Sequence, residues 1–289
     1  MAAGSIDPRG PVNREGLRRL GFELGDCLGG RSHGAWRATS RDGTPVVLKW
    51  DADAATERRH SALHPSLRAL RARGVPVPDY LYIGAFDGGT LTAQTVLPGR
   101  SEDTHPPAVI AGIVASIDAA HGLPAPPPRA AVQGWGALVA RTLTHGQPGW
   151  APHEPLRTWG PRSAAMLHRA RAASAGAERG RYPENGLVHL NLHTDNILIE
   201  NGHLSGIIDW DGACRGDPHY DLVQYAFDLD GHGQPVWELV EAAHIAPPVL
   251  RAYLAVLAIK CTSSAICADP ADVARQLDRA ERVFDRFGL

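Results

Sequence analysis

The chain has 289 residues, 44% of them hydrophobic, and a formal net charge of −2. This length and composition are ordinary for a globular protein of two lobes, and the near-neutral charge gives no reason to expect a nucleic-acid partner. The N-terminus lacks a charged-then-apolar leader, and no run of about 18 apolar residues occurs, so we expect neither a cleaved signal nor a membrane span. The four cysteines lack a CxxC spacing, which favours a reduced, cytoplasmic protein.

Residues 22–36 contain two strand-like segments joined by a glycine-rich loop. Glycines let backbone N–H groups approach phosphate oxygens closely, so we expect this loop to cover a phosphate, with Gly29, Gly30 and Ser32 in contact with it. The loop has neither the GxGxxG order of a dinucleotide site nor the GxxxxGK[ST] order of a P-loop. An ordinary glycine hairpin is the alternative interpretation.

Lys49 ends an apolar run at residues 45–48 that is typical of a strand. The chain has only two lysines among its 29 basic residues, so a lysine at this place indicates a role for the compact ammonium group. The pattern then becomes helical, and Glu57 lies where a helix could turn it toward the lysine. Pro65 interrupts this helical pattern. A plain strand-end cation and a solvated helix face are the alternatives for Lys49 and Glu57.

The sequence pattern changes from strand-like to helix-like near residue 100. Strands are predicted at residues 80–83 and 90–96, on both sides of an Asp-Gly-Gly turn. Apolar residues at helical spacing then predict helices over residues 108–121, 130–144 and 161–175, with a closing amphipathic helix over 271–287. We therefore expect a small β-rich lobe over residues 1–97 and a larger helical lobe over residues 98–289.

The stretch Val-His-Leu-Asn-Leu-His-Thr-Asp-Asn-Ile-Leu-Ile at residues 188–199 carries the strongest signal. Its apolar end is separated from the apolar residues 206–208 by Glu-Asn-Gly, a turn that joins two short antiparallel strands. Asn196 begins the first strand and Asp209 ends the second, so their oxygens can converge on one cation. Because Mg²⁺ prefers a few oxygen ligands shared with phosphate, we predict a magnesium site there.

Three elements in this order carry a resemblance: residues 189–198 as His-x-Asn-Leu-His-x-x-Asn-Ile-Leu, then Ile-Asp-Trp, then Gly-Asp-Pro-x-x-Asp-Leu at residues 216–222. Together they resemble the aminoglycoside phosphotransferase family, the kinase-like enzymes that include choline, homoserine and antibiotic kinases. The resemblance implies an α+β, two-lobed protein-kinase-like fold that uses ATP or GTP with Mg²⁺ to phosphorylate a small-molecule hydroxyl. The site residues that it implies are Lys49, Glu57, Gln94 and Val96 for the nucleotide, Asn196 and Asp209 for the metal, and His189 as a brace of the catalytic loop.

Asn191 departs from this family pattern, which has an aspartate at the same place. An amide cannot take up the proton of the acceptor hydroxyl, and general-base catalysis contributes about 10²–10⁴-fold to rates. The chain as written should therefore transfer phosphate slowly or not at all. Three interpretations stay open: a deliberately inactivated variant, a natural nucleotide-binding pseudoenzyme, and an enzyme that uses another base.

The acceptor is the least determined part of the prediction. Between residues 189 and 250 the chain carries ten acidic residues and one arginine, Arg215. A cleft lined with carboxylates would attract a small cationic acceptor, such as an aminoglycoside or a basic tuberactinomycin-type peptide antibiotic. We expect Asp228 and Asp230 to contact it. A solvated acidic surface, a non-catalytic pseudokinase and a metabolic kinase of the choline or homoserine type are the alternatives.

Overall fold

The computed structural model describes residues 13–29, 34–128, 134–173 and 182–289. These residues divide into two compact units. The first unit runs to Gly99 and also contains Ser205–Ile208, and the second contains all the other described residues. The short later segment belongs to the first unit because the Ile207 N–H donates to the Pro76 carbonyl at 2.8 Å.

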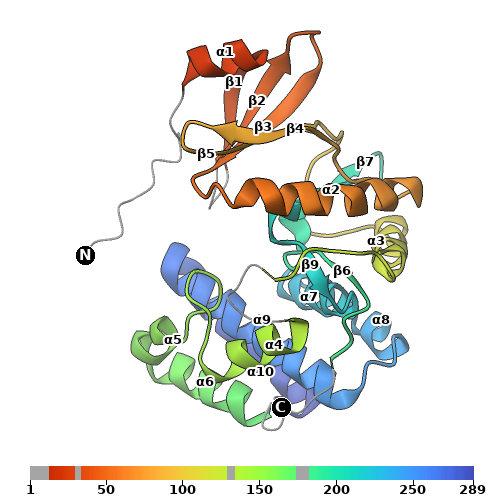
Figure 1. The fold of residues 1–289 in the computed structure, drawn as a ribbon. Helices are drawn as coiled ribbons and strands as arrows, with labels where there is room; N and C mark the ends of the chain where they lie inside the picture. Colours follow the sequence, from red (N-terminus) through yellow and green to blue (C-terminus); the bar gives the residue numbers. More distant parts are fainter. Residues whose placement is uncertain (1–12, 30–33, 129–133, 174–181) are drawn as a thin grey trace. The chain divides into compact units, whose positions relative to one another are not determined.

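The first unit is built on one antiparallel sheet in the strand order β1-β2-β3-β5-β4 (Figure 1). In this sheet β3 is central, and Lys49 on β3 lies opposite Ala35 on one neighbour and Thr92 on the other. The strand bounds are Phe22–Gly29 for β1, Ala35–Ser40 for β2, Pro45–Asp51 for β3, Tyr80–Phe86 for β4 and Gly89–Thr95 for β5.

The core of this unit lies on one face of the sheet, beside helix α1 (Arg14–Leu20). Leu17 of α1 packs there with buried strand residues such as Val46, Leu48 and Leu91. Trp50 closes the edge of this cluster, because its indole Nε1 donates to the Phe86 carbonyl at 2.9 Å. Burial of these strand residues on one face explains the alternating pattern in the sequence.

Helix α2 (Thr56–Ala72) runs without a break through Pro65, so the expectation that this proline interrupts the helix was wrong. The proline lacks an N–H for the Ser61 carbonyl, but both residues are exposed, and water can take that bond. The helix is held instead by its buried leucines Leu63, Leu67 and Leu70.

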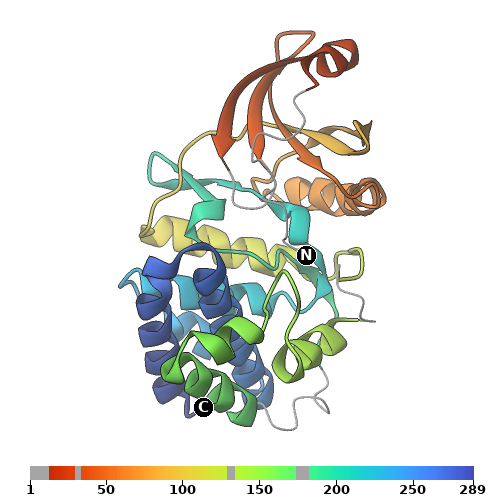
Figure 2. The same cartoon turned by 90° about the vertical axis from the view of Figure 1, so that its left-hand side faces the viewer.

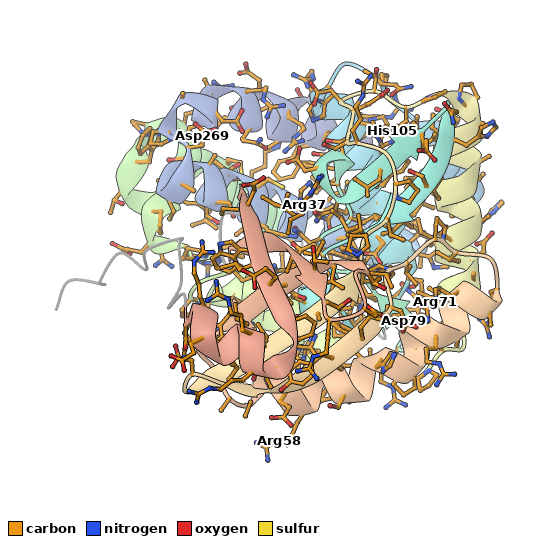
Figure 3. The ribbon with its side chains drawn as sticks, turned by 90° about the horizontal axis from the view of Figure 1, so that it is seen from above. Arg37, Arg58, Arg71, Asp79, His105 and Asp269 are labelled. Carbon is orange, nitrogen blue, oxygen red and sulfur yellow. The ribbon has the colours of Figure 1, made fainter. Side chains whose placement is uncertain are left out.

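Near the end of α2, Arg71 pairs with Asp79 at 2.6 Å, and the two side chains lie side by side in Figure 3. The His64 ring contacts the same carboxylate at 2.8 Å, and together the two partners hold its pKa below the usual value despite burial. These contacts connect the helix to the start of β4.

The two hairpin turns predicted from the sequence have the backbone that such turns need. Asp87 and Gly88 join β4 to β5 with φ values of 50° and 79°. Asn201 and Gly202 join β7 (Ile197–Glu200) to β8 (His203–Ile207) with φ values of 52° and 76°. Two consecutive positive φ angles define the two-residue turn that matches strand twist, which explains the Asp-Gly and Asn-Gly sequences.

The second unit is mainly helical, with β6 (Gly186–Val188) paired to β9 (Cys214–Gly216) as a small second element. The predicted helices are present with shifted ends: α3 begins one residue earlier than expected, and the second helix begins at Trp135, after Gly134, which is not helical. The helix bounds are Pro107–Ala120 for α3, Trp135–Thr144 for α4, Glu154–Trp159 for α5, Pro161–Ala173 for α6, His219–Gly231 for α7, Trp237–Ala242 for α8, Pro247–Ala268 for α9 and Val273–Phe287 for α10.

Helix α9 forms the centre of this unit and is packed by α4, α5, α6, α7 and α10 (Figure 2). Its side chains are buried nearly all round, among them Tyr253, Leu257 and Ile259. By length and composition α9 could cross a membrane, but 72% of its most apolar window is buried in the structure, as in the core helix of a soluble protein. A helix that is apolar on every side is expected in such a central position.

Candidate active site

The loop of residues 189–196 follows β6 directly. Leu187 and Val188 of β6 are fully buried, and their pairing with β9 fixes the point at which the loop begins. The loop ends in a short 3-10 turn, Thr194–Asn196, from which β7 continues. The polar residues singled out in the sequence therefore lie between two anchored strands.

Asp221, on α7, holds the start of this loop. Its carboxylate accepts the backbone N–H of His189 at 2.6 Å and that of Leu190 at 3.0 Å. Leu190 has a φ of 70°, a left-handed conformation that is uncommon for a residue other than glycine. Burial raises the pKa of Asp221 to about 7, although both backbone N–H groups favour its ionised form. The carboxylate thus stabilises a strained backbone beside Asn191.

His189 is buried and packs against the segment that carries Asp209. Its Nδ1 accepts the Asn191 N–H at 3.3 Å, and its ring lies 4.5 Å from the ring of Trp210, centroid to centroid. Asp209 directly precedes that tryptophan and has a left-handed φ of 65°. The histidine therefore connects the loop of residues 189–196 to the turn that follows β8, as expected of a residue that holds the loop in place.

The Asn191 amide is hydrogen-bonded at both ends. Its Oδ1 accepts from Lys260 Nζ at 3.1 Å, and its Nδ2 lies 3.1 Å from His193 Nε2. Lys260, on α9, also donates to the Leu190 carbonyl at 2.7 Å. An amide oxygen in this place can orient a hydroxyl group but cannot remove its proton at neutral pH.

Asn196 lies on the other side of the same imidazole. Its Nδ2 donates to the Asn191 carbonyl at 2.9 Å and is 3.3 Å from His193 Nε2. Because two amide nitrogens face Nε2, that atom must be the unprotonated one. Burial lowers the pKa of His193, which agrees with a neutral ring, although the Asp209 carboxylate acts in the opposite direction.

These contacts fit the two residues predicted to bind magnesium. The amide nitrogen of Asn196 is engaged within the loop, so its Oδ1 is the atom that could meet a cation, and Asp209 is close enough to influence His193. Among the described residues, no group of three or more His, Cys, Asp or Glu side chains could hold a metal alone. A hard cation here would take its other ligands from phosphate and water.

The structure places Asp228 and Asp230 in ion pairs with helix α10. Asp228 accepts the Thr194 N–H at 2.8 Å and lies 3.5 Å from Arg279, and Asp230 lies 3.1 Å from Arg282. Farther along, Arg286 pairs with Glu241 at 2.9 Å. Residues 189–250 contain only one arginine, but helix α10 supplies three further arginines that pair with carboxylates of this segment. Asp228 and Asp230 are thus engaged inside the protein, and they do not support the expected contact with a cationic acceptor.

The nucleotide residues predicted from the sequence lie in the first unit. Lys49 is on the central strand β3, and Glu57 is the second residue of α2, where its N–H donates to Thr90 Oγ1 at 3.1 Å. Gln94 is buried on β5, and Val96 directly after β5 is 39% exposed. Gln94 lies opposite the β3 residue Val47, so two of the predicted nucleotide residues, Lys49 and Gln94, are on neighbouring strands.

The predicted phosphate-covering loop is described only in part. Gly29 is the last residue of β1 and lies opposite Ala35. Gly30 and Ser32 lie outside the described residues. Their predicted phosphate contacts stay predictions.

Lys260 is the residue of this site that the sequence reasoning missed. It is the second of the two lysines in the chain, so the scarcity that drew attention to Lys49 could have selected it as well. It lies 69 residues from Asn191, on a helix whose apolar sequence reads as ordinary core. Only the packing of α9 against the loop brings the two residues together.

Comparison with known proteins agrees with this architecture. The model of the phosphotransferase enzyme family APH matches residues 26–255. Among curated relatives, the homoserine kinase of Neisseria meningitidis is 44% identical over 44 residues, which cover 15% of this chain and 14% of that protein. The homoserine kinase of Methylobacterium radiotolerans is 33% identical over 87 residues, which cover 28% and 27%. The matched segments therefore span little more than a quarter of these relatives.

Solved structures match over nearly the whole chain. A thermostable mutant of the aminoglycoside phosphotransferase APH(4)-Ia, in a ternary complex with ADP and hygromycin B, has a TM-score of 0.70 and 20% identity, and the match covers 96% of this chain and 98% of that one. The macrolide 2'-phosphotransferase MphH from Brachybacterium faecium has a TM-score of 0.54 and 19% identity, with coverage of 92% and 95%. At these identities the matches show the fold, and they confirm the predicted two-lobed kinase-like architecture. The family match covers most of the chain, and the protein belongs to the phosphotransferase enzyme family of small-molecule kinases.

Proposed function

We propose that the chain is, in its parent chemistry, an ATP- and Mg²⁺-dependent phosphotransferase that acts on a hydroxyl group of a small molecule. The observation that carries the proposal is the loop of residues 189–196, in which Asn191, His193 and Asn196 are hydrogen-bonded to one another and Asp209 follows the adjoining hairpin. This order and grouping match what phosphoryl transfer requires. Complexes of a structural neighbour with ADP and with AMP-PNP support a nucleotide as the phosphate donor.

In this reaction the acceptor oxygen forms a bond to the γ-phosphorus while the bond from that phosphorus to the β,γ-bridging oxygen breaks, and the acceptor loses its proton. Lys49 and the glycine loop would hold the phosphates. Asn196 and Asp209 would hold the metal, which would neutralise negative charge on the phosphate oxygens. Residue 191 stands where the proton is taken up. With an amide there, we expect transfer that is slower by about 10²–10⁴-fold than with a carboxylate.

We infer that the acceptor is an antibiotic. Support comes from the fold, since a neighbour over 96% of this chain is described in complex with ADP and hygromycin B. Three carboxylates of the acidic stretch, those of Asp228, Asp230 and Glu241, pair with α10 arginines, so fewer acidic groups are left to attract a cationic acceptor. A metabolic hydroxyl such as that of homoserine is the alternative that the local matches to homoserine kinases favour.

A second candidate is a nucleotide-binding pseudokinase, which the amide at position 191 favours. The two candidates share metal-dependent nucleotide binding, and they differ in phosphate transfer. The experiment compares the chain as given with Asn191→Asp by mass spectrometry of phosphate incorporation. The acceptor panel contains hygromycin B, other aminoglycosides, basic peptide antibiotics, homoserine and choline.

Phosphorylation of one antibiotic by the Asp form supports the proposal in full. Phosphorylation of homoserine or choline alone supports the kinase activity and overturns the antibiotic assignment. If neither protein phosphorylates any acceptor while both bind AMP-PNP in a Mg²⁺-dependent manner, the phosphotransferase proposal is wrong and the pseudokinase is favoured. Asn196→Ala, which removes a predicted metal ligand together with its hydrogen bond to the Asn191 carbonyl, should weaken the Mg²⁺ dependence of AMP-PNP binding by both proteins.

A further inference from the structure

Lys260 is a buried cation, and each of the three N–H groups of its ammonium can donate to an acceptor of the protein. Its Nζ donates to the Leu190 carbonyl at 2.7 Å and to Asn191 Oδ1 at 3.1 Å. With the Gln224 amide in the orientation that satisfies its neighbours, the Gln224 oxygen accepts from Nζ at 3.3 Å and its nitrogen donates to the Leu190 carbonyl at 3.1 Å. Three acceptors match the three N–H groups of an ammonium ion.

Within the described part of the chain, no carboxylate oxygen lies within 4 Å of Lys260 Nζ. The charged groups that face it are Asp221 and Asp228 on α7, which act at longer range, and Cys261 on its own helix. On the loop side it faces His193, whose pKa it helps to lower. The Trp150 ring lies 5.6 Å from Nζ and offers only a cation–π contact. A buried charge that meets neutral acceptors alone is an expensive arrangement.

The place of this charge is specific, because one of its three acceptors is the side chain at position 191. A carboxylate there would offer Lys260 an oxygen in the same position as Asn191 Oδ1, with a full charge instead of a dipole. A charge-assisted hydrogen bond is roughly twice as strong as a neutral one. The second oxygen would take the place of Asn191 Nδ2, 3.1 Å from His193 Nε2, and would be the oxygen free of Lys260 that can receive the proton of the acceptor hydroxyl.

We propose that Lys260 is the positioning residue for the side chain at position 191, and that the pocket it forms with Leu190 and Gln224 is built for a carboxylate there. The proposal rests on the proposed phosphotransferase function. It assigns to α9 a role in orienting the base, in addition to the hold that α7 has on the loop through Asp221. It also favours, among the three interpretations of Asn191, those in which the site once carried an aspartate.

The test is a double-mutant cycle with the chain as given, Asn191→Asp, Lys260→Met and the double variant. The assay measures kcat and KM with the acceptor found by mass spectrometry. We expect Asn191→Asp to raise kcat at least about 100-fold when Lys260 is present and less than about 10-fold in the Lys260→Met background, with little change in KM for the acceptor. Methionine is an unbranched side chain one atom shorter than lysine, and it removes the charge while keeping most of the apolar stem. Arg282→Met is the matched control, since it removes the charge of an arginine that is 56% exposed and pairs with Asp230, and it should leave the gain intact.

A second readout, thermal unfolding, does not depend on activity. With Lys260 present, Asn191→Asp should raise the melting temperature, because the buried ammonium gains a counter-ion. In the Lys260→Met background the same change should lower it, because the carboxylate is then buried without a partner. This reversal of sign supports the proposal even if no acceptor is phosphorylated, a result that would contradict only the phosphotransferase function.

Two results overturn the proposal. One is an equal gain in kcat in both Lys260 backgrounds, which would leave the phosphotransferase function intact. The other is a change in melting temperature of the same sign and size in both backgrounds.

Discussion

Asp221 Oδ1 accepts the N–H of Leu190 at 3.0 Å, and Leu190 is held at a φ of 70°, in the left-handed region. The residue that follows it is Asn191, so this bond from α7 holds the backbone immediately before the predicted base position. Lys260 donates to the carbonyl of the same leucine and so holds the next peptide group, between Leu190 and Asn191. The loop conformation is therefore imposed by two helices and not by the local sequence.

Asp221→Asn should destabilise the protein and loosen this loop. One N–H of the pair from His189 and Leu190 would then face an amide NH₂ group and lose its acceptor, which costs about 1–3 kcal/mol for a buried donor. Denaturant unfolding measures the change. Asp195→Asn, at an exposed carboxylate in the same loop, is the control and should change stability far less. Equal effects of the two substitutions would contradict the role given to Asp221.

The stability that Lys260 contributes should depend on pH above neutrality. Burial lowers the pKa of Lys260 to about 8 from its usual value of 10.5. Since the pKa is lower in the folded state, folding disfavours the charged form of the lysine. The stability is therefore fully present above pH 10.5, where the lysine is neutral in both states, and is lost as the pH falls through about 8. As the pH falls across that window, the free energy of unfolding of the chain as given should decrease by on the order of 3 kcal/mol relative to that of Lys260→Met.

Urea unfolding of both proteins between pH 7 and about pH 10 measures this difference, and groups common to both cancel in the comparison. A difference that stays constant over the whole range would show that the lysine titrates as it does in water.

Gly216→Ala should be strongly destabilising, whereas Gly160→Ala should be tolerated. A Cβ at Gly216 would lie 2.6 Å from Cε3 of Trp135, a fully buried ring, and 2.9 Å from Val188 Cγ2. Overpacking against such rigid neighbours costs about 1–3 kcal/mol. Gly160 is the matched control, because it is extended at a φ of 172° and a Cβ there would meet no atom of the described residues within 4 Å beyond its chain neighbours. Melting temperatures compare the two, and similar values would contradict the close approach of β9 to α4.

Arg279→Met should unfold the protein more easily than Arg282→Met. Arg279 is 3% exposed and lies over the Phe227 ring beside Asp228, whereas Arg282 is 56% exposed. Removing one partner of a buried pair costs about 3–5 kcal/mol, because the remaining charge is left without compensation. A pair whose arginine is largely exposed to water, as in Arg282–Asp230, contributes less, because an exposed ion pair is worth about 0–1 kcal/mol. Thermal unfolding of both variants tests the order, and the reverse order would show that Asp228 does not depend on Arg279.

Local features and the family of this protein could be predicted from the order of its residues. The hairpin turns were readable because Asn-Gly and Asp-Gly permit the positive φ angles that the turns need, and the order of His189, Asn196 and Asp209 carried the resemblance. Helix and strand types were readable from their periodicity. The passage of α2 through Pro65 was not, because buried leucines outweighed the missing hydrogen bond.

Which charged side chains contact one another depends on how the helices pack. The acidic stretch suggested a cationic acceptor, yet α10 supplies Arg279 and Arg282 from residues outside it. Likewise Lys260 reaches Asn191 only because α9 is buried against the catalytic loop. Coulomb interactions and hydrogen bonds depend on distance in space, and no local pattern of residues encodes a contact between segments that lie 50 to 70 positions apart.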